Sequence, residues 1–162
     1  GISYLIAGRN EDARDEFARS VDLTSNAWAY HGLACLYLKS DPEKAKQFIM
    51  EGMALQRERL SYQKEGFKIL EKCGAYKEID EEYKKQTAEN QKNGRIQYYY
   101  VAALEKLERN EEAYHLLNDG DGIDVSDIRE GDSDIQSIWE SLHEKVYGEK
   151  GHLPHYYNFK VN

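Results

Sequence analysis

The sequence has few prolines, few cysteines and fewer basic than acidic residues. Only two of its 162 residues are proline, while 40% are hydrophobic and 32% are charged. This composition is typical of a globular, helix-rich domain and not of a disordered chain. Lysine and arginine number 22 against 30 aspartates and glutamates, which gives a net charge of −8. Because phosphate backbones bind basic surfaces, we expect no nucleic-acid partner.

The two cysteines and the lack of a long apolar run indicate the compartment. Cys35 and Cys73 lie in segments with a helical pattern, which favours free thiols in a reducing compartment over a disulfide. No apolar run approaches the ~20 residues that a membrane span needs, and no signal peptide opens the chain. We therefore expect a cytoplasmic protein with no membrane partner. The chain opens at Gly1 inside a helical pattern, so we expect it to be a piece of a longer protein.

Four similar segments recur along the chain. Each begins with a turn residue, continues with acidic residues and then carries a small or aliphatic residue, with a large apolar residue four positions later. The small or aliphatic positions are Ala13, Ala45, Ile79 and Ala113, separated by 32, 34 and 34 residues. Each turn lies between two helical patterns of apolar residues. The run "IQYYYVAAL" is β-like in composition but continues into a strongly helical sequence, so we predict a helix there.

A period of 34 residues with helix–turn–helix units resembles the tetratricopeptide repeat family. Gly8, Ala13 and Phe17 match its glycine, alanine and aromatic positions, whereas the tryptophan and the final proline of its pattern are missing. The resemblance implies an all-α fold: a right-handed α-α superhelix of about three and a half hairpins over residues 1–120. One hairpin does not bury both of its faces, so stacked hairpins share a core.

The stretch "NDGDGIDVSDIREGDSD" suggests calcium at first sight, but no register places a carboxylate first and a glycine sixth, as an EF-hand loop requires. We interpret residues 121–132 as an acidic linker and expect no metal. Residues 133–148 follow with Ile135, Ile138, Trp139 and Leu142 on one helix face. We predict a capping helix that covers the last hairpin with Trp139 as its anchor. We predict that residues 149–162 form an extended tail.

Catalytic motifs are scarce in the sequence. It contains no H-E-x-x-H, no glycine-rich phosphate loop, no G-x-S-x-G elbow and no C-x-x-C. His152 and His155 are three residues apart but lack nearby further ligands for zinc. We expect no cofactor and no enzymatic activity in this part of the protein, although an upstream catalytic domain is compatible with the sequence.

The resemblance also implies a binding groove lined by the first helix of each hairpin. Tyrosine offers rigid contact area, and lysine or arginine pairs with carboxylates, so such a groove suits an acidic protein or peptide. The alternative is that the lysines only solubilise the surface and the tyrosines belong to the core. The candidate partner-binding residues at these positions are Tyr30, Tyr37, Lys64, Lys68, Arg95 and Tyr98.

Three functional hypotheses follow. The first is a non-catalytic scaffold that binds a protein or peptide. The second comes from the tail, where "DVSDIREGDSDIQSIWESLHEKVYG" resembles the C-terminal segment of bacterial proteins with a mutarotase-like β-sandwich. That resemblance implies an accessory region of a larger bacterial, carbohydrate-related enzyme, docked on its own N-terminal domain. The third is self-association through the first hairpin, where Ile2, Leu5 and Ile6 are apolar.

Overall fold

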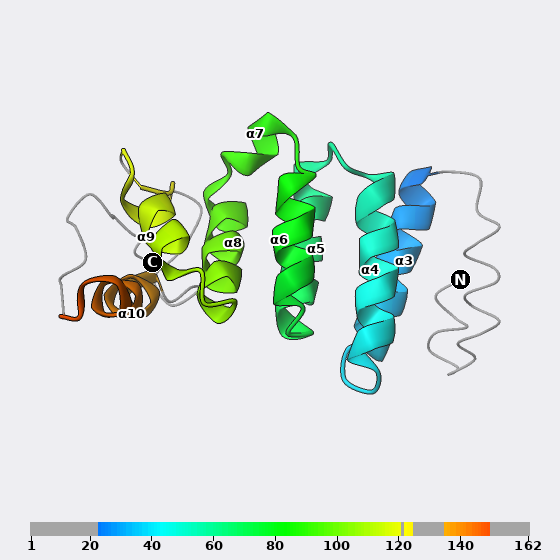
Figure 1. Ribbon diagram of the computed structural model, residues 1–162. Coiled ribbons are helices and arrows are strands. Elements are labelled where there is room, and N and C mark those ends of the chain that lie inside the picture. Colours follow the sequence, from blue (N-terminus) through cyan, green and yellow to red (C-terminus); the bar gives the residue numbers. More distant parts are fainter. Residues whose placement is uncertain (1–22, 121, 125–134, 150–162) are drawn as a thin grey trace, which may run out of the picture. The chain divides into compact units, whose positions relative to one another are not determined.

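The computed structural model describes residues 23–120, 122–124 and 135–149 (Figure 1). Within these ranges every regular element is an α-helix and there is no strand, which confirms the all-α prediction. None of these helices is both long enough and apolar enough to span a bilayer. The chain divides into two compact units, residues 1–75 and 76–162, which are described separately. The first half-hairpin with Ala13, most of the acidic linker and the tail from residue 150 lie outside the described residues.

The first unit contains α3 (Leu23–Tyr37), α4 (Pro42–Leu55) and α5 (Leu60–Lys72). Helices α3 and α4 pack along each other as a hairpin, and α5 packs against α4 and more lightly against α3. The start of α4 is set by its sequence. The Asp41 side chain accepts a hydrogen bond from the Lys44 amide at 3.2 Å, and Pro42 occupies the first turn, where its missing N–H is not needed.

Two side chains of α5 fix it against the first hairpin. Tyr62 is fully buried, and its hydroxyl donates to the Ala27 carbonyl. Gln63 is also fully buried, and its amide donates to the carbonyls of Met53 at 3.1 Å and Gln56 at 2.7 Å. Because the last carbonyls of a helix have no partner within it, Gln63 satisfies the C-terminal end of α4 from the next helix.

The second unit contains α6 (Tyr76–Lys84), the short α7 (Ala88–Gln91), α8 (Gly94–Lys106), α9 (Asn110–Asn118) and α10 (Ile135–Tyr147). Asn93 caps α8 by accepting from the amides of Arg95 at 3.1 Å and Ile96 at 3.2 Å. The β-like run therefore lies inside a capped helix, as predicted. Helix α8 packs against α6 and α9.

The repeated segments fall at the same place in successive helices. The fourth residue is Ala45 in α4, Ile79 in α6 and Ala113 in α9, and all three are fully buried. Small or aliphatic side chains at this position allow a neighbouring helix to approach closely. The sequence period thus corresponds to a repeated helix position, seen once in the first unit and twice in the second.

Two inter-helix turns also repeat 34 residues apart. After α5 the Ala75 amide donates to the Leu70 carbonyl at 2.9 Å, and Gly74 has φ of +68°. After α8 the Arg109 amide donates to the Leu104 carbonyl at 2.9 Å, and Glu108 has φ of +62°. Both ends are Schellman-type caps, in which a left-handed residue reverses the chain. Glu108 adopts this conformation although glycine is the residue that does so without strain.

Helix α10 packs against α9 and more lightly against α8 (Figure 1, orange). Trp139 is only 4% exposed, and its indole Nε1 donates to Asn118 Oδ1, at the last residue of α9, at 2.8 Å. Its ring stacks on His143 and lies near Tyr114. The shared core of these helices consists of Tyr100, Val101, Leu104, Ala113, Leu117, Ile123, Ile135, Trp139 and Leu142. Trp139 therefore packs as predicted from its helix face.

Candidate functional site

Helix α3 is unusual for a helix of this charged chain. None of its 15 residues is aspartate, glutamate, lysine or arginine. A helix without a charged face is ordinarily covered on all sides. Yet Trp28 of α3 is 39% exposed, and Cys35 is also exposed. This uncharged, partly open surface is the strongest candidate for a binding site in the first unit.

The open side of α3 lies beside α5. The Trp28 ring meets the Tyr62 ring edge-on at 4.9 Å between centroids, and it meets His31 at 5.3 Å. His31 Nε2 lies 3.5 Å from Glu65 Oε2, which links the two helices. We call this surface the α3–α5 face and define it by Trp28, His31, Cys35, Glu65, Lys68 and Lys72.

The charged groups of the α3–α5 face act on the Cys35 thiol. Although the residue as a whole is exposed, partial burial of its thiol raises the pKa of Cys35, and the negative charge of Glu65 raises it further, while Lys72 and Lys68 act in the opposite direction. The thiol therefore stays protonated at neutral pH, because an ordinary cysteine already titrates above 8. Its Sγ lies 3.9 Å from His31 Nδ1, at the limit of a weak hydrogen bond. This cysteine is not an activated nucleophile.

The predicted tyrosines of the first unit lie elsewhere. Tyr30 stacks on Phe48 of α4 with 6.2 Å between ring centroids, and Tyr37 meets the same ring at 5.8 Å. Lys44 lies over the Tyr37 ring at 4.8 Å. Both tyrosines thus pack inside the α3–α4 hairpin. Of the predicted lysines on α5, Lys68 is exposed and belongs to the α3–α5 face, and Lys64 is half-buried.

The two predicted residues of the second unit lie on α8. Arg95 is half-buried in the first turn of the helix, directly after the cap. Tyr98 is half-buried and packs against the core shared with Trp139. Further along α8, Glu105 lies 3.6 Å from Lys145 of α10. Helix α10 therefore contacts the C-terminal part of α8, beyond the predicted residues Arg95 and Tyr98.

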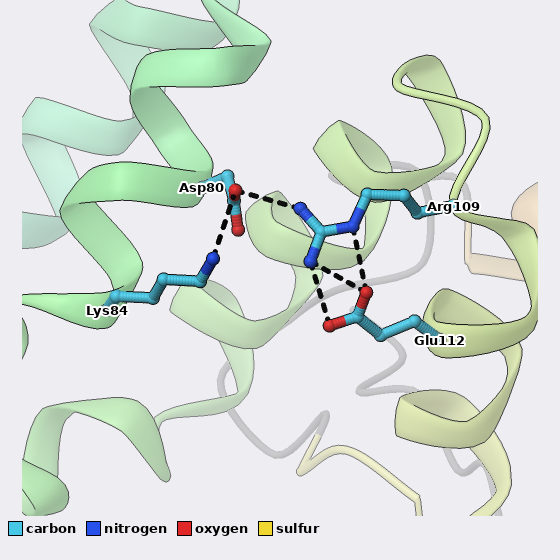
Figure 2. Close-up of polar contacts among 4 residues, drawn as sticks. All are labelled: Asp80, Lys84, Arg109 and Glu112. Carbon is cyan, nitrogen blue, oxygen red and sulfur yellow. Dashed lines mark hydrogen bonds and ion pairs between the residues drawn. The ribbon is translucent and has the colours of Figure 1, made fainter.

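A second polar cluster lies on α6 and α9 (Figure 2). Arg109 Nη1 donates to Asp80 Oδ2 at 2.8 Å, and its other nitrogens hold Glu112 at 2.8 and 3.0 Å. Lys84 approaches the same Asp80 oxygen at 3.4 Å. The hydrogen bonds with Glu112 contribute most to raising the pKa of Arg109, and the one with Asp80 raises it further. Every charge in this cluster has a partner of opposite sign, so the cluster ties α6 to α9 and offers no free reactive group.

Metal ligation finds no support in this part of the chain. Among residues 23–120, 122–124 and 135–149, no group of three His, Cys, Asp or Glu side chains is arranged to hold an ion. His31, Cys35 and Glu65 come nearest in type. However, Cys35 and Glu65 face different nitrogens of the imidazole ring, so one ion does not reach all three.

Sequence reasoning missed Trp28. The resemblance assigned the groove to Tyr30 and Tyr37, which lie on the α4 side of the helix. The signal that points to Trp28 is the helical spacing of Trp28, His31 and Cys35, which share one face at i, i+3 and i+7.

Comparisons with known proteins return no relative. No family model, no curated protein and no solved structure matches the chain.

Proposed function

We propose that the chain is a non-catalytic scaffold of tetratricopeptide-like hairpins that binds a protein or peptide on the face of its first helices. The observation that carries the proposal is the uncharged helix α3, whose Trp28 is 39% exposed beside α5. Exposed aromatic side chains on a rigid helical scaffold are favourable anchors for a partner, because they bury a large area with little loss of conformational entropy.

Two further observations support the scaffold. The register of Ala45, Ile79 and Ala113 and the repeated turns at Gly74 and Glu108 fit an array of similar hairpins. Stacked hairpins of this kind present their first helices as an extended surface, and the right-handed superhelix implied by the family resemblance would provide it.

The test is a selection of peptides from a random library on the purified chain, followed by titration of ¹⁵N-labelled protein with the selected peptides. We expect saturable binding with shift changes concentrated in residues 26–37 and 60–72. A chain that binds no selected peptide saturably, or that responds only around Arg109 and Glu112, would overturn the proposal. The accessory-region alternative predicts instead that a globular domain, and no peptide, occupies the same residues.

A further inference from the structure

The α3–α5 face carries an exposed tryptophan at one end and two exposed lysines at the other. Trp28 lies near the start of α3 against the buried Tyr62, and both belong to the early turns of their helices. Cys35 lies near the end of α3, where the charges of Lys68 and Lys72 act on its thiol. The two ends are therefore chemically distinct along one pair of helices.

The lysine end of the face also holds two acids, Glu65 and Glu71, but neither forms an ion pair with Lys68 or Lys72. Lys68 and Lys72 are both exposed, and within the described part of the chain neither ammonium makes an ion pair. Of the nearby acids, Glu65 faces His31. Burial raises the pKa of Glu71, while the charge of Lys72 acts in the opposite direction. Two unpaired lysines are notable in a chain whose net charge is −8.

We propose that the α3–α5 face binds an extended acidic peptide segment, an inference that rests on the proposed function. An aromatic or aliphatic side chain of the peptide packs on Trp28, and carboxylates further along pair with Lys68 and Lys72. Charge complementarity selects the carboxylates, and the exposed indole selects the apolar residue.

The spacing of the peptide follows from the helix. Trp28 and Cys35 are seven residues apart, which is about 10 Å along a helix axis at ~1.5 Å per residue. An extended peptide advances ~3.3 Å per residue, so this distance corresponds to about three of its residues. Side chains at i, i+2 and i+4 share one side of an extended chain. The carboxylates therefore belong two and four residues from the apolar anchor.

The experiment compares two labelled peptides of glycine and serine by fluorescence anisotropy. Both carry one phenylalanine, followed at two and four positions by glutamate in the first peptide and by glutamine in the second. We expect the glutamate peptide to bind about tenfold more tightly, since two partly exposed ion pairs contribute at this scale. Raising the salt concentration should reduce the difference.

Charge-reversal variants test the residues. The double variant Lys68→Glu with Lys72→Glu should lose the preference for glutamate. The matched control is Lys77→Glu with Lys106→Glu, which changes the net charge equally at two other exposed lysines and should keep the preference. Lys106 lies in the last turn of α8, as Lys72 does in α5, so the effects on helix ends are comparable. Circular dichroism of each variant checks the fold.

The outcomes separate this inference from the proposed function. Equal binding of the two peptides, or loss of the preference in the control variant, overturns the proposal of an acidic partner. The proposed scaffold function stands as long as selected peptides bind residues 26–37 and 60–72. Dimerisation in sedimentation equilibrium that is abolished by Trp28→Gln also overturns it, because a second copy would then occupy the face. Failure of every selected peptide overturns the proposed function itself.

Discussion

Replacement of Trp139 by alanine should destabilise the second unit strongly. A buried tryptophan removes roughly 150–250 Å² from water, which at ~25 cal/mol per Å² corresponds to about 4–6 kcal/mol. Trp139 is 4% exposed, so nearly all of this applies. The variant also leaves Asn118 Oδ1 without its indole donor, a loss of about 1 kcal/mol. Partial relaxation of the cavity offsets some of the sum, and we expect a loss of about 4 kcal/mol in the free energy of unfolding.

The assay is urea denaturation followed by far-UV circular dichroism. Trp139→Phe keeps most of the ring area and loses the hydrogen bond to Asn118, so it should cost only about 1–2 kcal/mol. Leu36→Ala is the control, because Leu36 is 36% exposed on α3 and should cost less than about 1 kcal/mol. A loss below about 1 kcal/mol for Trp139→Ala would show that α10 is not anchored by this side chain, and the reasoning would fail.

Three further predictions concern the second unit. Glu108→Gly should raise the free energy of unfolding by up to about 1 kcal/mol in thermal or urea denaturation, because glycine adopts φ of +62° without strain, whereas Glu108→Ala should bring no gain. Gly94→Ala should cost more than about 2 kcal/mol by the same assay, because an added Cβ would lie 1.4 Å from the Asp124 carbonyl oxygen and the backbone must shift; a neutral effect would contradict this approach of the two segments. Burial, together with the nearby charge of Asp80, raises the pKa of Tyr100 to about 12, so the folded state retains a proton that the unfolded state loses near pH 10. The stabilisation by the protonated Tyr100 should therefore be complete below pH 10 and be lost as the pH rises toward 12. In Tyr100→Phe the urea midpoint should depend less on pH over this window.

The repeat period predicted the helix register well. Residues at 34-residue spacing occupy the same helix position, as expected of hairpins of nearly the same length. Ala45, Ile79 and Ala113 show this directly, since each is buried at the fourth position of its helix. Glu108, the first residue of the fourth similar segment, also lies at an observed turn, although nothing in its side chain favours a left-handed backbone. The Schellman hydrogen bonds of the flanking residues stabilise that conformation.

The candidate site was harder to predict for a physical reason. The rotation of a helix about its axis is read from the contrast between an apolar and a charged face. Helix α3 has no charged face, so its sequence does not distinguish the side of Tyr30 and Tyr37 from the side of Trp28. Only tertiary packing decides, because Phe48 of α4 engages the two tyrosines and leaves Trp28 beside α5.

The ion cluster on α6 and α9 was equally invisible in the sequence. Asp80 and Arg109 are 29 residues apart, and each lies in a segment with many other charges. Nothing in a single sequence indicates which acid meets which base across a turn and a helix. Arg109 directly follows the left-handed Glu108, and from there its guanidinium reaches Asp80 of α6 and Glu112 of α9 (Figure 2).

Gln63 and Trp139 share an arrangement with a consequence for how such a chain can change in length. Each lies on a helix that follows a hairpin, and each donates a hydrogen bond backward, Gln63 to the last carbonyls of α4 and Trp139 to the final residue of α9. Each of these joints, the contact between a hairpin and the helix that follows it, therefore involves only neighbouring elements of the chain. In the hairpin array proposed above, insertion or removal of a whole 34-residue module would therefore disturb only the two joints beside it, and the remaining joints would stay intact.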